Sequence, residues 1–65
     1  MAAAAASSLK SLGADLRALR KARGQTLAHL AKQLDKSVGW LSQVERDISQ
    51  PSIDDLRALA AALDV

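Results

Sequence analysis

Residues 26–46 read TLAHLAKQLDKSVGWLSQVER, and they contain the most informative local signals in the chain. Thr26 is a suitable N-cap for a helix over 27–34, in which leucine and alanine recur at the spacing of one buried face. Ser37 is a suitable N-cap for a second helix over 38–46. Only three residues lie between the two helices, so the pair cannot lie parallel and must cross steeply. Such a crossing is the geometry of a helix-turn-helix.

The helix predicted over 38–46 has two different faces. Leu41 and Val44 fall on an aliphatic side that can dock against the rest of the domain, and Ile48 continues that side. In a helix-turn-helix the second helix enters the major groove of DNA, so its other side is expected to read bases. A glycine permits close approach there, a glutamine can bond bidentately to adenine, and valine and tryptophan can meet a thymine methyl group. The candidate base-contacting residues are Val38, Gly39, Trp40 and Gln43.

Two of these residues also have ordinary interpretations. Gln43 can be a polar residue on a solvated face, and we favour a base contact because of the motif. Trp40 can be a packing residue with Leu27 within reach, or a half-buried ring whose edge faces the DNA, and the sequence leaves both open. Hydroxyl groups, positive charge and places at helix N-termini suit contacts with the DNA backbone. The candidate phosphate-contacting residues are Thr26, Lys36, Ser37, Ser42 and Arg46.

The segments on either side predict two more helices. Leucines at positions 9, 12, 16 and 19 form one apolar stripe in a helix over 9–23, and Gly24 follows as a helix-ending glycine. Ser52 is placed to cap a last helix over 53–63, whose inner stripe begins at Ile53. The core is expected to contain Leu16, Leu19, Leu30, Leu34, Leu41, Val44, Leu56, Leu59 and Leu63.

The sequence therefore predicts an all-α fold, a compact four-helix domain over 9–65 with its helix-turn-helix at about 27–46. A chain of 65 residues has room for one domain, and the alanine- and serine-rich residues 1–8 are expected to be a disordered lead-in. Hydrophobic residues make up 49% of the chain, and most are alanine or leucine, which favour helices. Trp40 is the only aromatic residue, which argues against a small β-domain.

The inventory of reactive residues argues against an enzyme. The chain has no cysteine, no tyrosine and no glycine-rich phosphate loop, so disulfides and thiolate metal sites are excluded. His29 is the only histidine and has no partner at metal-ligand spacing, so we expect neither a metal nor a cofactor. No apolar run reaches the roughly 18 to 20 residues that span a bilayer, and residues 1–8 are not typical of a signal peptide. We therefore expect a cytoplasmic protein without a membrane partner.

At this point the sequence resembles a known family, the phage-repressor and Cro type of helix-turn-helix, often called the XRE class. The resemblance covers residues 12–65, and its most telling pieces stand in the family's order. They are Leu19-Arg20…Gly24…Leu30-Ala31, Ser37…Leu41-Ser42-Gln43-Val44-Glu45, Pro51-Ser52 and Leu59-Ala60…Leu63. The resemblance implies sequence-specific binding of double-stranded DNA by a transcriptional regulator. It also places Arg20 against Glu45 as a structural ion pair on the core side.

The chain departs from the family's pattern at four positions. Leu27 stands where the family has glutamine, and Lys36 stands where it has an apolar residue. Asp35 and Asp47 replace two turn glycines; aspartate tolerates the left-handed conformation better than most residues. Asp47 would place a carboxylate close to the expected DNA, which is expected to weaken binding rather than to change the fold.

The partners follow from the size of the module. One module reads about half a turn of DNA, so specific binding is expected to need a homodimer on two half-sites. The segments TLAHLA, SVGWLSQVER and QPS are similar to those of regulators that carry a C-terminal cupin sensor domain. The resemblance implies that this sensor domain, and a fifth helix of the longer parent protein, would be absent from this chain.

Charge leaves an alternative function open. Residues 1–36 carry seven basic and two acidic side chains, whereas residues 37–65 are net acidic, and the total is only +2. The basic half suits nucleic acid, although many solvated helices look similar. The small total, an exposed Trp40 and the acidic Asp47 would suit a helix-turn-helix-shaped protein-interaction module that does not bind DNA. The salt dependence of binding separates the two.

Overall fold

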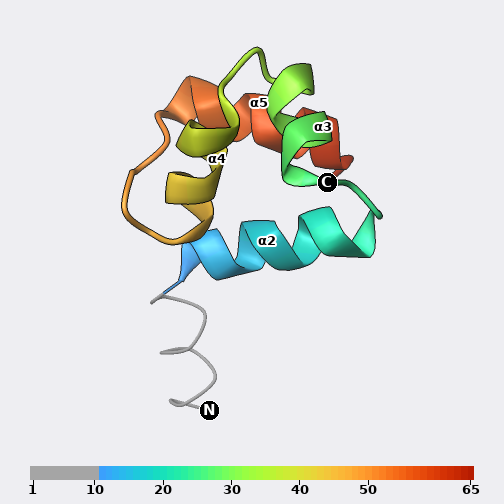
Figure 1. The fold of residues 1–65 in the computed structure, drawn as a ribbon, viewed down its shortest axis with the longest axis horizontal. Helices are drawn as coiled ribbons and strands as arrows, with labels where there is room; N and C mark the ends of the chain where they lie inside the picture. The colour runs from blue at the N-terminus through green and yellow to red at the C-terminus, as the bar shows by residue number, and fades with distance from the viewer. Residues whose placement is uncertain (1–10) are drawn as a thin grey trace.

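The computed structural model describes residues 11–65, so the lead-in predicted over 1–8 lies outside the described residues. Its helices are α2 (Leu12–Ala22), α3 (Leu27–Gln33), α4 (Val38–Glu45) and α5 (Ile53–Leu63) (Figure 1). Within 11–65 every regular element is a helix, which confirms the all-α prediction and the compact four-helix architecture. The ends of α2, α3 and α4 each come one residue earlier than predicted, and α5 matches its predicted range.

Each helix begins at a serine or threonine that caps it. The side-chain oxygens of Thr26, Ser37 and Ser52 each accept a hydrogen bond from the backbone N–H three residues further on, as predicted. Ser11 does the same for the N–H of Ala14 at the start of α2, and residues 9 and 10 of the predicted helix lie outside the described residues. Such a cap contributes roughly 0.5–2 kcal/mol to stability, which is large for a domain this small.

Left-handed residues end the helices. Gly24 follows α2 with a φ of +68°, which confirms the expected helix-ending glycine. Asp35, Asp47 and Asp64 take the same conformation after α3, α4 and at the end of α5, with φ values of +57°, +61° and +59°. Asp35 thus occupies the turn of the helix-turn-helix in the conformation expected of it. Four residues connect α2 to α3 and four connect α3 to α4, whereas seven connect α4 to α5.

The core is formed mainly by leucines from all four helices. Leu16, Leu30, Leu41, Val44, Leu59 and Leu63 are buried as predicted, and Leu19, Leu34 and Leu56 are partly buried against them. Ala31 is also buried. Two expectations were wrong: Ile48 is 63% exposed and Ile53 is 66% exposed. The left-handed turn after α4 carries Ile48 off the helical face, and Ile53 is the first residue of α5, where side chains still point to solvent.

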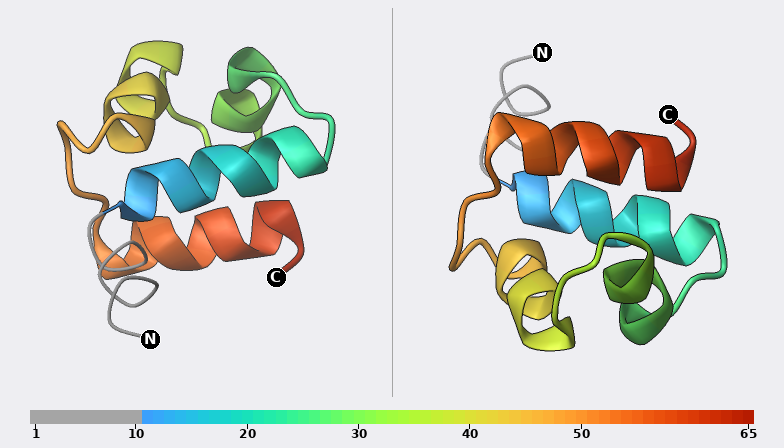
Figure 2. Two further views of the ribbon diagram at one scale, coloured as in Figure 1. Left: turned by 90° about the horizontal axis from the view of Figure 1, so that it is seen from below. Right: turned by 90° about the horizontal axis from the view of Figure 1, so that it is seen from above.

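The helix-turn-helix packs along one side of α2. Figure 2 shows α2 and α5 running in the same direction, with α3 and α4 along one edge of α2. α4 contacts both α2 and α3, so it is held from two sides. The far ends of α2 and α5 are joined where the Arg23 guanidinium donates to the backbone carbonyl of Asp64 at 3.0 Å. Among residues 11–65, this frame leaves the remaining side of α4 uncovered.

Gly13 sets how closely α2 approaches α4. It is buried, and a Cβ at this position would collide with the backbone carbonyl groups of Val44 and Glu45. Only glycine therefore allows the first turn of α2 to lie against the last turn of α4. Sequence reasoning missed Gly13, because it lies within the predicted helix and breaks no apolar pattern.

Candidate nucleic-acid interface

The buried side of α4 is fixed to α2 by an ion pair. Arg20 Nε donates to Glu45 Oε2 at 2.7 Å and Arg20 Nη2 donates to Glu45 Oε1 at 3.1 Å, with side-chain exposures of 9% and 4%. The third nitrogen, Nη1, donates to the backbone carbonyl of Gln25 at 2.7 Å. The structure thus brings together the two residues that the resemblance implied. A two-point contact of this kind fixes α4 in rotation as well as in position.

The outer face of α4 combines an apolar side chain, a glycine without a side chain and a polar side chain. Val38 is 46% exposed, and Gly39 and Gln43 are exposed beside it. Gln43 Oε1 accepts a hydrogen bond from the Ser49 hydroxyl at 3.1 Å, which restrains the amide in one orientation. The oxygen keeps a second lone pair and the amide nitrogen keeps its donors, so both atoms can still meet a base edge.

Gly39 has no role in the packing of the described chain. The only atom near a Cβ at this position is the Ser37 hydroxyl oxygen, at 3.9 Å, which is ordinary contact or open space. A glycine inside a helix costs roughly 0.5–1 kcal/mol relative to alanine. Here that cost brings no packing gain, in contrast to Gly13. The open surface at Gly39 is instead suited to close approach by another molecule.

Trp40 is half-buried and packs against the leucine core, and Leu27 packs against the same core. The Lys36 ammonium lies 5.1 Å from the centre of the Trp40 ring, within the range of a cation–π contact. Lys36 Nζ is also 3.5 Å from Asp55 Oδ1, so one lysine connects the helix-turn-helix to α5. The structure therefore engages Lys36, a predicted phosphate contact, with two groups of its own chain.

Asp55 is the acidic end of this connection. Its carboxylate accepts a hydrogen bond from the Ser52 N–H at 3.1 Å, and its own N–H donates to the Ser52 hydroxyl at 3.1 Å. These two bonds form a capping box at the start of α5. The Ser52 N–H lowers the pKa of the Asp55 carboxyl below its ordinary value, with smaller contributions from the Ser52 hydroxyl and from Lys36.

Two predicted phosphate contacts are helix caps whose hydroxyl protons remain available. Thr26 Oγ1 accepts from the His29 N–H and Ser37 Oγ accepts from the Trp40 N–H, both at 3.0 Å. In each case the oxygen is the acceptor, so the hydroxyl hydrogen can still be donated to an anion. Both residues are exposed. Capping and backbone contact are therefore compatible at these positions.

The other two candidates lie along one edge of α4. Ser42 is partly buried and Arg46 is exposed one turn further on. The nearest described partner of the Arg46 guanidinium is the carbonyl of Ser42, at 3.4 Å from Nε, a long contact that leaves the charge accessible.

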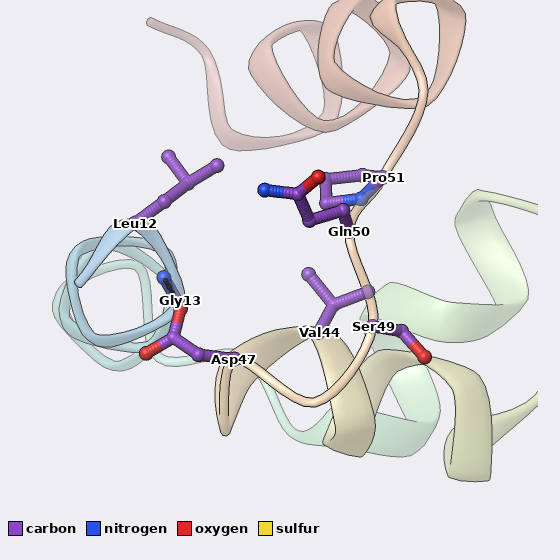
Figure 3. Close-up of a pocket in the computed structure, with 7 residues that line it drawn as sticks. All are labelled: Leu12, Gly13, Val44, Asp47, Ser49, Gln50 and Pro51. Atoms are coloured by element: carbon purple, nitrogen blue, oxygen red, sulfur yellow. Dashed lines mark hydrogen bonds between the residues drawn. The ribbon is translucent and has the colours of Figure 1, made fainter. Parts of the chain in front are cut away.

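The carboxylate of Asp47 is held by the start of α2. Its Oδ1 accepts from the Gly13 N–H at 2.9 Å and its Oδ2 accepts from the Ser11 hydroxyl at 3.0 Å. Figure 3 shows it beside Gly13, in a hollow of about 230 Å³ whose lining also includes Leu12, Val44, Ser49, Gln50 and Pro51. The sequence analysis expected this carboxylate close to the DNA; in the structure Asp47 is exposed, and both of its oxygens accept hydrogen bonds from the start of α2.

Other kinds of site find no support in the described chain. Within residues 11–65 no group of histidine and carboxylate side chains is placed to hold a metal ion, and His29 is exposed. No helix in the same range is long and apolar enough to cross a membrane.

Comparison with known proteins supports the geometry. Residues 11–65 match a family model described as a helix-turn-helix domain. Over 54 residues the chain is 37% identical to the immunity repressor protein of Bacillus phage phi105. The matched region covers 83% of this chain and 38% of the repressor. The chain thus spans well under half the length of this curated relative.

Two solved structures share the arrangement of the helices. The crystal structure of the clp gene regulator ClgR from Corynebacterium glutamicum has a TM-score of 0.81 and 39% identity, covering 83% of this chain and 57% of that one. The complex of the SinR and SinI proteins gives a TM-score of 0.77 and 34% identity, covering 83% of this chain and 53% of that one.

Proposed function

The chain belongs to the helix-turn-helix domain family, and from this premise we propose that it binds double-stranded DNA sequence-specifically as a transcriptional regulator. The observation that carries the proposal is that α4 has one face buried in the domain and one face exposed to solvent. Leu41, Val44 and Glu45 are buried, whereas Val38, Gly39 and Gln43 are exposed. A helix held this firmly with a small and polar outer face is suited to enter a major groove.

Each side chain on the exposed face has a distinct task in this proposal. Gln43, restrained by Ser49, reads an adenine edge with its amide oxygen and nitrogen. Val38 meets a thymine methyl group, and Gly39 lets the backbone of α4 come close to the base pairs. Trp40 contributes the exposed edge of a ring whose remaining surface is packed against the core.

The DNA backbone is held at the margins of α4. The Thr26 and Ser37 hydroxyls and the Ser42 hydroxyl donate to phosphate oxygens, and the Arg46 guanidinium supplies charge. Lys36 keeps its contacts with Asp55 and Trp40, so its part in backbone binding is long-range attraction to phosphate as well as support of the Trp40 ring. These contacts fix the register of α4, and the base edges supply the sequence preference.

Two copies of the module are proposed to act together. One α4 reads about half a turn, so a homodimer on half-sites roughly 34–36 Å apart would supply the specificity that one copy lacks. The chain spans 38% of the phage repressor, and a sensor domain of the cupin type beyond it stays a prediction. The family consists of regulators rather than enzymes, which agrees with the inventory of side chains.

A second candidate function is favoured by one specific finding. A relative of known structure, SinR, is seen in a complex with another protein, SinI. The alternative is that this chain uses its helix-turn-helix shape to bind a protein, with half-buried Trp40 at the contact.

Selection of duplexes from a random library, followed by titration at several salt concentrations, tests the proposal. Trp40 is the only aromatic residue, so its fluorescence reports on α4 without a label. We expect enrichment of a two-fold symmetric sequence and an affinity that falls steeply with salt, because several phosphates are neutralised. Absence of any salt-dependent binding to duplex DNA would overturn the proposal in favour of the protein-interaction module.

A further inference from the structure

A small hollow lies between α2, the start of α3 and the end of α4. It has a volume of about 210 Å³. Its lining comes from three helices and contains three arginines. The lining residues are Arg17, Arg20, Leu27, Ser42, Glu45 and Arg46.

The charges around this hollow are not equivalent. Arg20 and Glu45 satisfy each other through two hydrogen bonds, so the one carboxylate in the lining is neutralised. Arg17 is exposed and makes no ion pair or hydrogen bond with another side chain within residues 11–65. Arg46 is exposed, and within the same residues its guanidinium donates only to the backbone carbonyl of Ser42, at 3.4 Å. The Arg20–Glu45 pair therefore adds no net charge to the hollow. The guanidinium groups of Arg17 and Arg46 and the Ser42 hydroxyl around it remain free to bind an anion.

Arg17 also belongs to a longer basic edge. A second hollow on α2 is lined by Arg17 and Lys21 together with alanines and Glu45. Residues four apart share a helix face, so the two cations form one positive edge of α2. Nothing in the packing of the described core requires either charge, because both side chains are exposed.

We propose that Arg17 and Arg46 clamp one backbone phosphate of the DNA over this hollow, with Ser42 donating to the same group. The inference rests on the proposed function and adds a contact from α2, a helix outside the helix-turn-helix. Ser42 and Arg46 lie one turn apart on α4, next to Gln43, so a phosphate held there flanks the groove that Gln43 reads. Guanidinium groups suit this task because they present a planar fork of donors to phosphate oxygens.

The test measures binding of a fluorescein-labelled duplex of random sequence, two helical turns long, at a series of salt concentrations. Phosphate contacts need no particular sequence, so an operator is not required. Arg17→Ala is expected to lower the slope of log affinity against log salt by up to about 0.9, the share of the one phosphate that Arg17 holds together with Arg46 and Ser42. Arg17→Lys should keep the wild-type slope, since it keeps the charge. Thermal unfolding should be unchanged for both, because the side chain is exposed.

Arg57→Ala is the matched control, since it removes an exposed arginine from α5 that lines neither hollow. If Arg17→Ala and Arg57→Ala change the slope equally while Arg46→Ala lowers it further, Arg17 acts only through net charge and the clamp is wrong, although DNA binding stands. If the wild type shows no salt-dependent binding, both the proposed function and the clamp fail. If Arg17→Ala lowers the salt slope and Arg57→Ala does not, the result supports the clamp.

Discussion

The carboxylate of Asp47 accepts a hydrogen bond from the backbone N–H of Gly13 at 2.9 Å, so the residue that ends α4 also holds the first turn of α2. The two residues meet where the helices approach closely enough to exclude a Cβ. An acidic side chain at a helix N-terminus is favoured by the helix dipole as well as by the unpaired N–H groups. The end of α4 and the first turn of α2 are therefore one structural unit.

Replacement of Asp47 tests this unit. Asp47→Ala loses both hydrogen bonds and puts alanine at a φ of +61°, so we expect the free energy of unfolding to fall by about 2–3 kcal/mol. Asp47→Gly relieves the backbone but still loses the bonds, and should cost about 1 kcal/mol. Urea denaturation provides the measurement. An Asp47→Gly variant as stable as the wild type, or more stable, would contradict the expected net loss.

The two helical glycines of the chain should respond in opposite ways to alanine. Gly13→Ala drives a methyl group into the carbonyls of Val44 and Glu45, so a loss of about 3 kcal/mol or more is expected. Gly39→Ala meets open space and should raise stability by roughly 0.5–1 kcal/mol. The same Gly39→Ala variant should bind DNA more weakly, because the methyl group separates α4 from the bases. A Gly39→Ala protein that is more stable and binds DNA as well as wild type would remove Gly39 from the interface.

A double-mutant cycle measures the Arg20–Glu45 pair. Arg20→Met or Glu45→Leu alone leaves one charge buried without its partner, so each should cost about 3–5 kcal/mol. The double variant should cost clearly less than the sum, since no charge remains buried. Thermal or urea unfolding in the presence of a stabilising osmolyte keeps the single variants measurable. Additive costs would show that the two side chains act independently.

The pKa of Asp55 gives the domain a predictable response to acid. Because the folded state lowers this pKa below the ordinary value of 3.8, the ionised carboxylate stabilises the fold above that value. The contribution is lost as the pH falls through the lower, folded-state pKa. Asp55→Asn should therefore be less stable than wild type at neutral pH, and the difference should close in strong acid. Unfolding curves across pH 2–7, a range of about five units around the carboxyl titration, make the comparison; a difference that does not depend on pH would contradict it.

Local signals explain why much of the fold could be predicted from the sequence. Thr26, Ser37 and Ser52 act within four residues of themselves, and the leucine stripe follows helical periodicity, so neither needs knowledge of the tertiary structure. Ile48 was misplaced because periodicity was extended past a residue whose left-handed φ ends the helix. The role of Asp47 depends on residues 34 and 36 positions away in the sequence, which no local pattern reports.

The candidate site divides in the same way. The outer face of α4 follows from helical geometry, so the exposure of Val38, Gly39 and Gln43 was predictable. Arg17 was missed because a lone arginine on α2 looks like any solvated residue until α4 is packed beside it. The Ser49 hydroxyl that restrains Gln43 lies beyond the end of the helix and carried no signal either.

Separate tasks for Gln43 and Arg46 give the last prediction. Gln43→Ala should cost about 1–3 kcal/mol on the selected sequence and little on a scrambled duplex, because a bidentate base contact carries sequence information. Arg46→Ala should weaken binding to both duplexes alike and lower the salt slope by about one, as loss of one phosphate contact requires. Gln33→Ala, which removes an exposed glutamine from the end of α3, serves as the control.

The comparison depends on the ratio of affinities for the two duplexes rather than on either affinity alone. Gln43 is held through its oxygen by Ser49, so Ser49→Ala should lower that ratio less than Gln43→Ala does, while leaving the salt slope unchanged. Fluorescence titrations of selected and scrambled duplexes at several salt concentrations give both quantities for each variant. If Gln43→Ala and Arg46→Ala weaken binding to the two duplexes by the same factor, Gln43 is not a reader of sequence, and the preference must come from Val38, Trp40 or the shape of the DNA.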